Sequence, residues 1–328
     1  MTEPNQTLVQ AEHLKKYFNL GHNRILHAVD DVSFQIPRQR TLGLVGESGC
    51  GKTTVGRTLV RLYEPDGGKI FFDGKDITSI HGKERRELTR RVQMVYQDPY
   101  ASLNPFFTVG EIIKEGLEIH HIGKDDHERM QMVYELLEKV GLHAEHANRF
   151  PHEFSGGQRQ RVGLARSLAV NPEFIVCDEA ISALDVSVQA QIVNLLVDLQ
   201  KEMKLTYLFI AHDLSMVRYI SDEICVMYLG QMVETGYTSE VYDHPLHPYT
   251  QGLLDAVPVA DPDFEEERKN QIILQGEVTS PVNPKPGCRF AARCPYAKEN
   301  CFNTEPVLEE VTKDHFVKCH YVKEINGF

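Results

Sequence analysis

The sequence predicts an α/β fold built on a parallel sheet, and two observations support this prediction. The apolar run Thr41–Val45 leads through a cluster of glycines into a helical pattern over Lys52–Leu62. Further along the chain, the apolar runs Phe174–Cys177 and Tyr207–Ala211 are separated by a helical pattern over Val188–Lys201. Strands that alternate with helices in this way are typical of parallel sheets.

The remaining elements are expected around this core. Further strands are predicted over Leu8–Leu14, Ala28–Ile36, Lys69–Phe72 and Ile224–Tyr228, and a further helix over Gln158–Ala169. Between Pro99 and Phe154 the pattern becomes helical. One helix is predicted there because its apolar residues share one face: Met130, Val133, Leu136, Leu137 and Val140. Asp125 can cap this helix and Gly141 can end it. We expect a helical lobe over about residues 99–157, packed on the main sheet.

Composition limits the classes of function. The chain has 328 residues, with 35 Lys and Arg against 47 Asp and Glu, so its net charge is −12. This balance argues against duplex nucleic acid as a ligand, because phosphate backbones favour basic surfaces. The N-terminus carries no secretory pattern, and no apolar run is long enough to span a bilayer. We therefore expect a cytoplasmic protein whose seven cysteines are reduced.

A phosphate-binding loop is predicted between the strand at Thr41–Val45 and the following helix. The residues from Gly46 to Thr53 fit the pattern GxxxxGK[ST]. Glycines let successive backbone N–H groups point at phosphates, Lys52 supplies a positive charge and the Thr53 hydroxyl can bind Mg²⁺. The candidate ATP-binding residues here are Gly46, Glu47, Ser48, Gly49, Cys50, Gly51, Lys52, Thr53 and Thr54. The alternative is a glycine-rich turn that merely contains a lysine.

Polar residues follow two further predicted strands. Asp178 and Glu179 end the apolar run that begins at Phe174, where ligands bind in open α/β sheets. Asp178 is placed to hold Mg²⁺, and Glu179 to orient or deprotonate the attacking water. His212 follows the run Tyr207–Ala211 and can donate to the γ-phosphate. The alternative for the two carboxylates is an N-cap of the next helix.

A second glycine motif, Ser155-Gly156-Gly157-Gln158, precedes a helix. Helix N-termini bind anions, but one chain offers no second triphosphate for this one. If two subunits face each other head to tail, each can present this motif to the ATP on its partner. The alternative is a helix capped by Ser155, with glycines for a tight turn.

With these motifs in place, residues from about Leu8 to Pro258 strongly resemble the nucleotide-binding subunits of ABC transporters. The resemblance implies a P-loop NTPase fold with a RecA-like core, an antiparallel β subdomain and a helical lobe. It also implies that Phe18, or else Tyr17, stacks on adenine, and that Gln97 reaches the metal or the water. Asp185 would lie in the dimer contact. Ala180 departs from the proline usual in the family, which leaves both carboxylates in place.

Other segments resemble the oligopeptide and dipeptide importer branch, which includes nickel importers. They are the stretch from Gln97 to Pro105, the stretch from His247 to Gln251, and the cysteine-containing tail. The resemblance implies a peptide importer, with a nickel importer as the alternative. The implied partners are a second ATPase subunit, two membrane permeases at whose cytoplasmic face this subunit lies, and an extracytoplasmic peptide-binding protein. A DNA-linked ATPase and a regulatory module without turnover are rival functions from other classes.

Four cysteines gather in the tail, which we expect to form a small extension over residues 259–328 after a nucleotide-binding domain over residues 1–258. An acidic, proline-containing linker around Asp263–Glu267 precedes them. Cys288, Cys294, Cys301 and Cys319 could bind Zn²⁺ or an iron–sulfur cluster, and their spacing does not decide between the two. The resemblance implies a [4Fe–4S] cluster. Zinc is one alternative, with His315 and His320 as possible substitute ligands, and reduced cysteines packed in a small core without a metal are the other.

Overall fold

The computed structural model describes residues 6–98, 100–182, 184–256 and 279–328. Its main sheet is mixed. Five strands run parallel: β6 (Val92–Val95), β7 (Phe174–Asp178), β8 (Thr206–Ile210), β3 (Thr41–Val45) and β9 (Glu223–Tyr228). Three antiparallel strands extend one edge: β10 (Gln231–Tyr237), β12 (His315–Val317) and β11 (Glu309–Thr312). The order across the sheet is β11-β12-β10-β9-β3-β8-β7-β6.

The parallel strands are mostly apolar because both of their faces are covered. Side chains that alternate along β7 enter two different cores: Phe174 and Val176 join one, whereas Ile175 and Cys177 join the other. The first core is completed by α1 (Lys52–Leu59), and the second by α5 (Gly156–Leu168) and α6 (Val186–Met203). The sheet therefore lies between two layers, and the carboxyl ends of its parallel strands share one edge.

A second, antiparallel sheet has the order β2-β1-β4-β5. Its strands are β1 (Thr7–Asn19), β2 (Ile25–Pro37), β4 (Gly67–Phe72) and β5 (Lys75–Asp76). The first two are longer than the sequence pattern predicted, because register shifts interrupt the period-two pattern of β1 where it pairs with β2. Helix α2 (Gly82–Arg91) then leads back to the main sheet.

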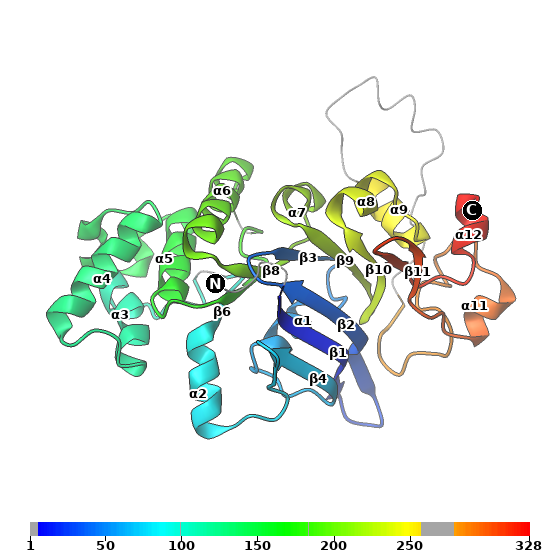
Figure 1. Ribbon diagram of the computed structural model, residues 1–328, viewed down its shortest axis with the longest axis horizontal. Coiled ribbons are helices and arrows are strands. Elements are labelled where there is room, and N and C mark those ends of the chain that lie inside the picture. Colours follow the sequence, from blue (N-terminus) through cyan, green and yellow to red (C-terminus); the bar gives the residue numbers. More distant parts are fainter. Residues whose placement is uncertain (1–5, 99, 183, 257–278) are drawn as a thin grey trace, which may run out of the picture.

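The predicted helical lobe contains α3 (Val109–Ile119), α4 (Asp126–Lys139) and two short 3₁₀ turns, η1 (Ala144–Asn148) and η2 (Pro151–Glu153), before α5. As predicted, Asp125 caps α4, and its side chain accepts the N–H of Glu128. Gly141, just beyond the end of α4, has a φ of 73°, the conformation that favours glycine after a helix. In Figure 1 the lobe lies at one end of the molecule.

The C-terminal residues lie at the opposite end from the helical lobe (Figure 1). Helices α7 (Leu214–Ile220), α8 (Thr238–Asp243) and α9 (Pro248–Asp255) precede them, and α11 (Glu299–Asn303) and α12 (Val322–Asn326) belong to them. Strand β12 pairs with β10, so the extension continues the main sheet. The predicted linker around Asp263–Glu267 is outside the described residues, and the boundary at residue 258 stays a prediction. In the described part of the chain, no helix is both long and apolar enough to cross a membrane.

Candidate functional site

The glycine loop between β3 and α1 adopts conformations that a side chain would oppose. Gly46, Gly49 and Gly51 have φ values of 149°, 78° and 108°. A Cβ at Gly51 would lie 2.0 Å from the carbonyl oxygen of Ala28, and one at Gly46 would lie 2.2 Å from that of Met227. The loop is therefore wedged between β2 and β9, whereas a Cβ at Gly49 would meet open space. This explains why glycine is needed at two positions for packing as well as for conformation.

Lys52 begins α1 and folds back over the loop. Its ammonium group donates to the carbonyl oxygens of Gly46 at 2.8 Å and Glu47 at 3.0 Å, and the residue is only 3% exposed. The charge is thus held at the centre of the loop, where an anion can meet it together with the helix N-terminus.

A cavity of about 250 Å³ opens beside this loop. Among the residues that sequence reasoning selected, Phe18, Gln97, Glu179 and the loop from Ser48 to Thr54 line it. Gly46 and Glu47 are not among its lining residues. The lining also includes five residues that the sequence did not point to: Leu26, His27, Ala28, Gly230 and Pro281.

Asp178, the last residue of β7, and Glu179, which follows it, carry the two predicted carboxylates, and of the two only Glu179 lines this cavity. The Thr53 hydroxyl donates to Asp178 at 2.7 Å, and Asp178 is 1% exposed. Burial raises the pKa of Asp178, with Thr53 acting in the opposite direction. The Gln97 amide donates to Glu179 at 2.6 Å, and Lys52 lies 4.0 Å from the same carboxylate. Glu179 has a φ of 46°, a strained conformation for glutamate of the kind that recurs at functional sites.

His212, which follows β8, is exposed and does not line the cavity. Sequence reasoning put it near the γ-phosphate, and the structure does not place it against the phosphate loop. Its role stays a prediction.

The motif at Ser155 lies outside the cavity. Ser155 caps α5 in a reciprocal arrangement: its side chain accepts the N–H of Gln158, whose side chain accepts the N–H of Ser155. A Cβ at Gly157 would lie 2.5 Å from Val188, so only glycine fits beside α6. Asp185 precedes α6 without a side-chain cap bond. One chain therefore does not bring this motif to its own phosphate loop.

Phe18 and Tyr17, the two residues suggested for adenine, make different contacts. Phe18 lines the cavity and meets the Tyr63 ring edge to face, with 5.5 Å between ring centroids. The Tyr17 hydroxyl instead donates to Asp30. Of the two residues suggested for adenine, Phe18 is the one that faces the cavity.

The phosphate loop is also held from behind by the C-terminal part of the chain. The Tyr249 hydroxyl accepts the Glu47 N–H at 2.9 Å. The Arg293 guanidinium donates to both carboxylate oxygens of Glu47, at 2.9 and 3.0 Å. Arg293 and Glu47 are 246 residues apart, so no local sequence signal could have linked them.

The four tail cysteines line one small cavity of about 20 Å³, together with His320. Burial raises the pKa of Cys288 and of Cys294 to about 11 each. Among the residues that the structure describes, however, no group of three or more His, Cys, Asp or Glu side chains is arranged to hold a metal ion. The predicted metal centre is therefore not supported. His315 lies elsewhere, where its Nε2 is 2.7 Å from the buried Glu234.

Comparison with known proteins agrees with this geometry. Residues 29–182 match the family model described as "ABC transporter", and residues 233–301 match "Oligopeptide/dipeptide transporter, C-terminal region". The putative oligopeptide transport ATP-binding protein YkfD of Bacillus subtilis is 55% identical over 313 residues, which are 95% of each chain. The oligopeptide transport ATP-binding protein AppF of the same organism is 52% identical, over 98% of this chain and 99% of that one.

Two solved structures resemble the fold. A dimeric ATP-binding cassette in a post-hydrolysis state, bound to ADP and Pi, is 27% identical with a TM-score of 0.65, and covers 70% of this chain and 99% of that one. The protein cbiO1 of Clostridium perfringens, part of an ABC transporter complex, is 26% identical with a TM-score of 0.65, over 73% and 92% of the two chains. Together with the relatives of more than half identity, these show that the chain is an ATPase and belongs to the ATP-binding subunits of ABC transporters.

Proposed function

We propose that this subunit hydrolyses ATP to power the import of oligopeptides or dipeptides. The observation that carries the substrate class is the match of residues 233–301 to the C-terminal region of oligopeptide/dipeptide transporters. The relatives named for oligopeptide transport span nearly the whole chain, which supports the same substrate. A nickel importer is the second candidate, because nickel importers belong to the branch that the sequence resembles.

The contacts in and around the cavity support the roles that we propose for individual side chains. Lys52 and the loop N–H groups bind the phosphates, and Phe18 packs against the base. Thr53 lines the cavity and is hydrogen-bonded to Asp178, and this pair of oxygen donors suits Mg²⁺. When bound, Mg²⁺ neutralises charge on the phosphates. Glu179, already oriented by Gln97, accepts the proton of the attacking water.

The second half of each ATP site comes from another subunit in this proposal. Ser155 to Gln158 and Asp185 lie away from the cavity of their own chain. A partner ATPase in a head-to-tail dimer can present the equivalent motif to the Gly46–Thr53 loop, and receive this one in return. His212 then meets the γ-phosphate only in the closed dimer. The partner that we propose is a homologous, non-identical subunit.

A permease contact is proposed on the helical lobe. A cavity of about 370 Å³ lies between the main sheet and the lobe, lined in part by Tyr96, Ile112, Ile119 and Arg166. Nearby, Phe106 is 86% exposed, which is unusual for a large apolar side chain. We propose that a cytoplasmic segment of one of two permeases docks here. This subunit then lies at the cytoplasmic face of the membrane, and an extracytoplasmic binding protein delivers the peptide.

The four tail cysteines are proposed to hold a metal centre. The four thiols line one cavity, and thiolates are ligands that iron–sulfur clusters and zinc take, although no three of these side chains are arranged around an ion position in the described residues. Burial raises the pKa of Cys288 and of Cys294, so these two thiols stay protonated unless a cation compensates for burial. We favour a [4Fe–4S] cluster. Anaerobic purification followed by iron, sulfide and zinc analysis tests this proposal. One equivalent of zinc without iron or sulfide would refute the cluster and assign the site to zinc.

Growth on defined peptides tests the substrate class. A strain that lacks this subunit should lose growth on short peptides as the sole source of a required amino acid, and should keep growth on the free amino acid. Re-introduction of the intact gene should restore it, whereas a Lys52→Ala variant should not. A defect corrected by added nickel salts, with normal peptide use, would favour the nickel importer. A phosphate-release assay on the purified chain separates both from a regulatory module without turnover.

A further inference from the structure

The contact between Arg293 and Glu47 joins the C-terminal extension to the phosphate loop. Both carboxylate oxygens accept guanidinium N–H groups, at 2.9 and 3.0 Å, and the Arg293 side chain is only 6% exposed. The guanidinium also donates to the Tyr228 hydroxyl at 3.3 Å and lies over the Tyr228 ring. A two-pronged pair of this kind fixes position as well as charge.

Glu47 occupies a demanding position for a carboxylate. It is the second residue of a loop whose N–H groups must face an anion, so an uncompensated charge there would repel ATP. Its main chain is held on both sides, because Tyr249 accepts its N–H and Lys52 donates to its carbonyl oxygen. Arg293 thus completes the restraint of this residue and cancels its charge.

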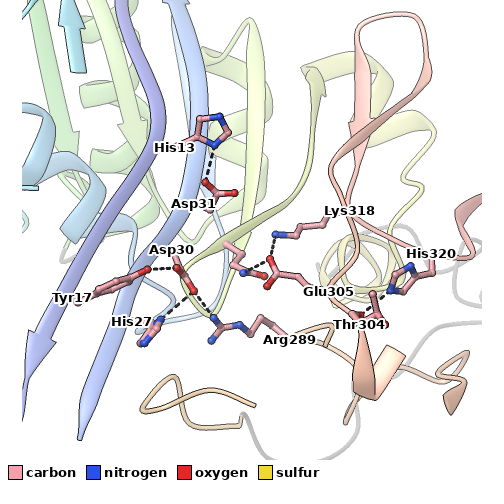
Figure 2. Close-up of polar contacts among 11 residues, drawn as sticks. His13, Tyr17, His27, Asp30, Asp31, Arg289, Thr304, Glu305, Lys318 and His320 are labelled. Carbon is pink, nitrogen blue, oxygen red and sulfur yellow. Dashed lines mark hydrogen bonds and ion pairs between the residues drawn. The ribbon is translucent and has the colours of Figure 1, made fainter. Parts of the chain in front are cut away.

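A second arginine of the extension anchors the other side of the cavity. Arg289 donates to Asp30, which also accepts from the Tyr17 hydroxyl and contacts His27 (Figure 2). This network lies behind the strand end that lines the cavity. Beside it, the His27 N–H donates to the carbonyl oxygen of Pro281 at 3.0 Å, and Pro281 itself lines the cavity.

We infer that the C-terminal extension is a structural part of the nucleotide site, in which Arg293 is a positioning residue that neutralises Glu47 and fixes the phosphate loop for ATP. Arg289 secures the same extension at the Pro281 wall. The two arginines lie next to Cys294 and Cys288, and Phe290 between them packs on Tyr228 and Tyr249. One short segment therefore connects the cysteine cavity to the loop. This inference rests on the proposed phosphate-binding role of Gly46–Thr53.

The test is nucleotide affinity in the full chain, measured with a fluorescent ATP analogue. Arg293→Gln should weaken binding by about tenfold, which corresponds to about 1.4 kcal/mol. Because the freed Glu47 carboxylate causes much of this loss, the double variant Arg293→Gln/Glu47→Gln should recover most of the affinity. Added salt should also recover part of it in the single variant, since salt screens exposed charges. A merely structural role for Arg293 predicts neither recovery.

Lys298→Gln is the matched control. Lys298 pairs with Glu324 in the same extension, but this pair is exposed and neither residue contacts the phosphate loop in the described contacts. Its affinity should equal that of the wild type. If thermal unfolding shows that Arg293→Gln is not folded, Arg293→Lys replaces it: one ammonium retains the charge without the two-pronged contact, so intermediate affinity is expected.

Two outcomes would overturn the inference. Wild-type affinity in both Arg293→Gln and Arg293→Lys would show that the contact does not support the site. Equal affinity in the single and double variants would show that Glu47 repulsion is not the cause. Failure of the wild-type chain to bind the analogue would instead refute the phosphate-loop assignment itself, so the two failures are distinguishable.

Discussion

The two glycine motifs that precede α1 and α5 look alike in sequence but differ in structure. Before α1, glycines adopt positive φ values so that the loop can curl around Lys52. Gly156 and Gly157 instead form the first turn of α5, and they are small because Leu184 and Val188 pack against them. The first motif encloses a charge within a cavity, whereas the second begins at the exposed residue Ser155. In the proposed dimer, the two motifs are the two halves of one kind of site, each completed by another chain.

The largest effect is expected on ATP turnover, at the phosphate-loop half of the site. Glu179→Gln should reduce ATP turnover by about 10²- to 10⁴-fold, the usual contribution of a general base, while nucleotide binding is retained. Phosphate release and binding of a fluorescent analogue measure the two effects separately. Glu202→Gln, at an exposed carboxylate paired with Lys139, serves as the control. Unchanged turnover in Glu179→Gln would rule out its assignment as the base.

A smaller effect on ATP turnover is expected at the Ser155 motif. Ser155→Arg should lower turnover by about a hundredfold, comparable to the loss of a donor to transition-state charge. ATP affinity of the separate chain should change by no more than about twofold, as for other surface substitutions. Asp125→Arg is the matched control, because it also removes an N-cap but lies on α4. Loss of affinity in Ser155→Arg would contradict the separation of the two halves.

A third prediction concerns the thermal stability of the chain and the buried carboxylate of Asp178. Because burial raises the pKa of Asp178, its charged form opposes folding. Its stabilising contribution is present below the pKa of the unfolded chain and is lost as the pH rises through the raised folded pKa. Asp178→Asn should therefore raise the melting temperature of the nucleotide-free chain at pH 7, by less at acidic pH, and should abolish turnover.

The control for this prediction is Asp126→Asn, because Lys114 holds the pKa of the exposed Asp126 below its usual value. That substitution should not stabilise the chain at pH 7. If Asp178→Asn melted below the wild type at neutral pH, the buried Asp178 carboxylate would be a stabilising group, and the inference that its burial costs stability would be wrong.

The smallest effect is expected at His247, which lines the cavity of the tail cysteines. Burial lowers the pKa of His247 from 6.5 to about 4, against the opposing effect of Glu234. Since the folded pKa is depressed, the stabilising contribution is present above pH 6.5 and is lost as the pH falls toward 4. His247→Gln should thus lose less stability than the wild type over this interval, as measured by urea unfolding. Parallel curves for the two chains would contradict the prediction.

Sequence reasoning was strongest where function depends on consecutive residues. The loop at Gly46–Thr53 and the strand end at Asp178 are local patterns, so their elements and mutual contact could be predicted. Tyr17 and Phe18 could not be separated, because their orientation depends on Asp30. The contact of Arg293 with Glu47, the pairing of β12 with β10 and the wall at Pro281 depend on tertiary contacts without a local signal. Likewise, the tail cysteines gather as expected, yet their spacing could not show whether a metal site forms.

A mixing experiment tests the central claim, that each loop needs the Ser155 motif of another chain, most directly. Lys52→Ala disables the loop half and Ser155→Arg disables the motif half, so each purified variant should be inactive. The assay uses this chain alone, so that it pairs with a second copy of itself in place of the proposed non-identical partner. In an equal mixture, half of these dimers combine the two variants, and each mixed dimer keeps one intact composite site of two. Turnover should therefore recover to about a quarter of the wild-type value. No recovery on mixing, with a wild type that is active under the same conditions, would show that each chain uses its own motif.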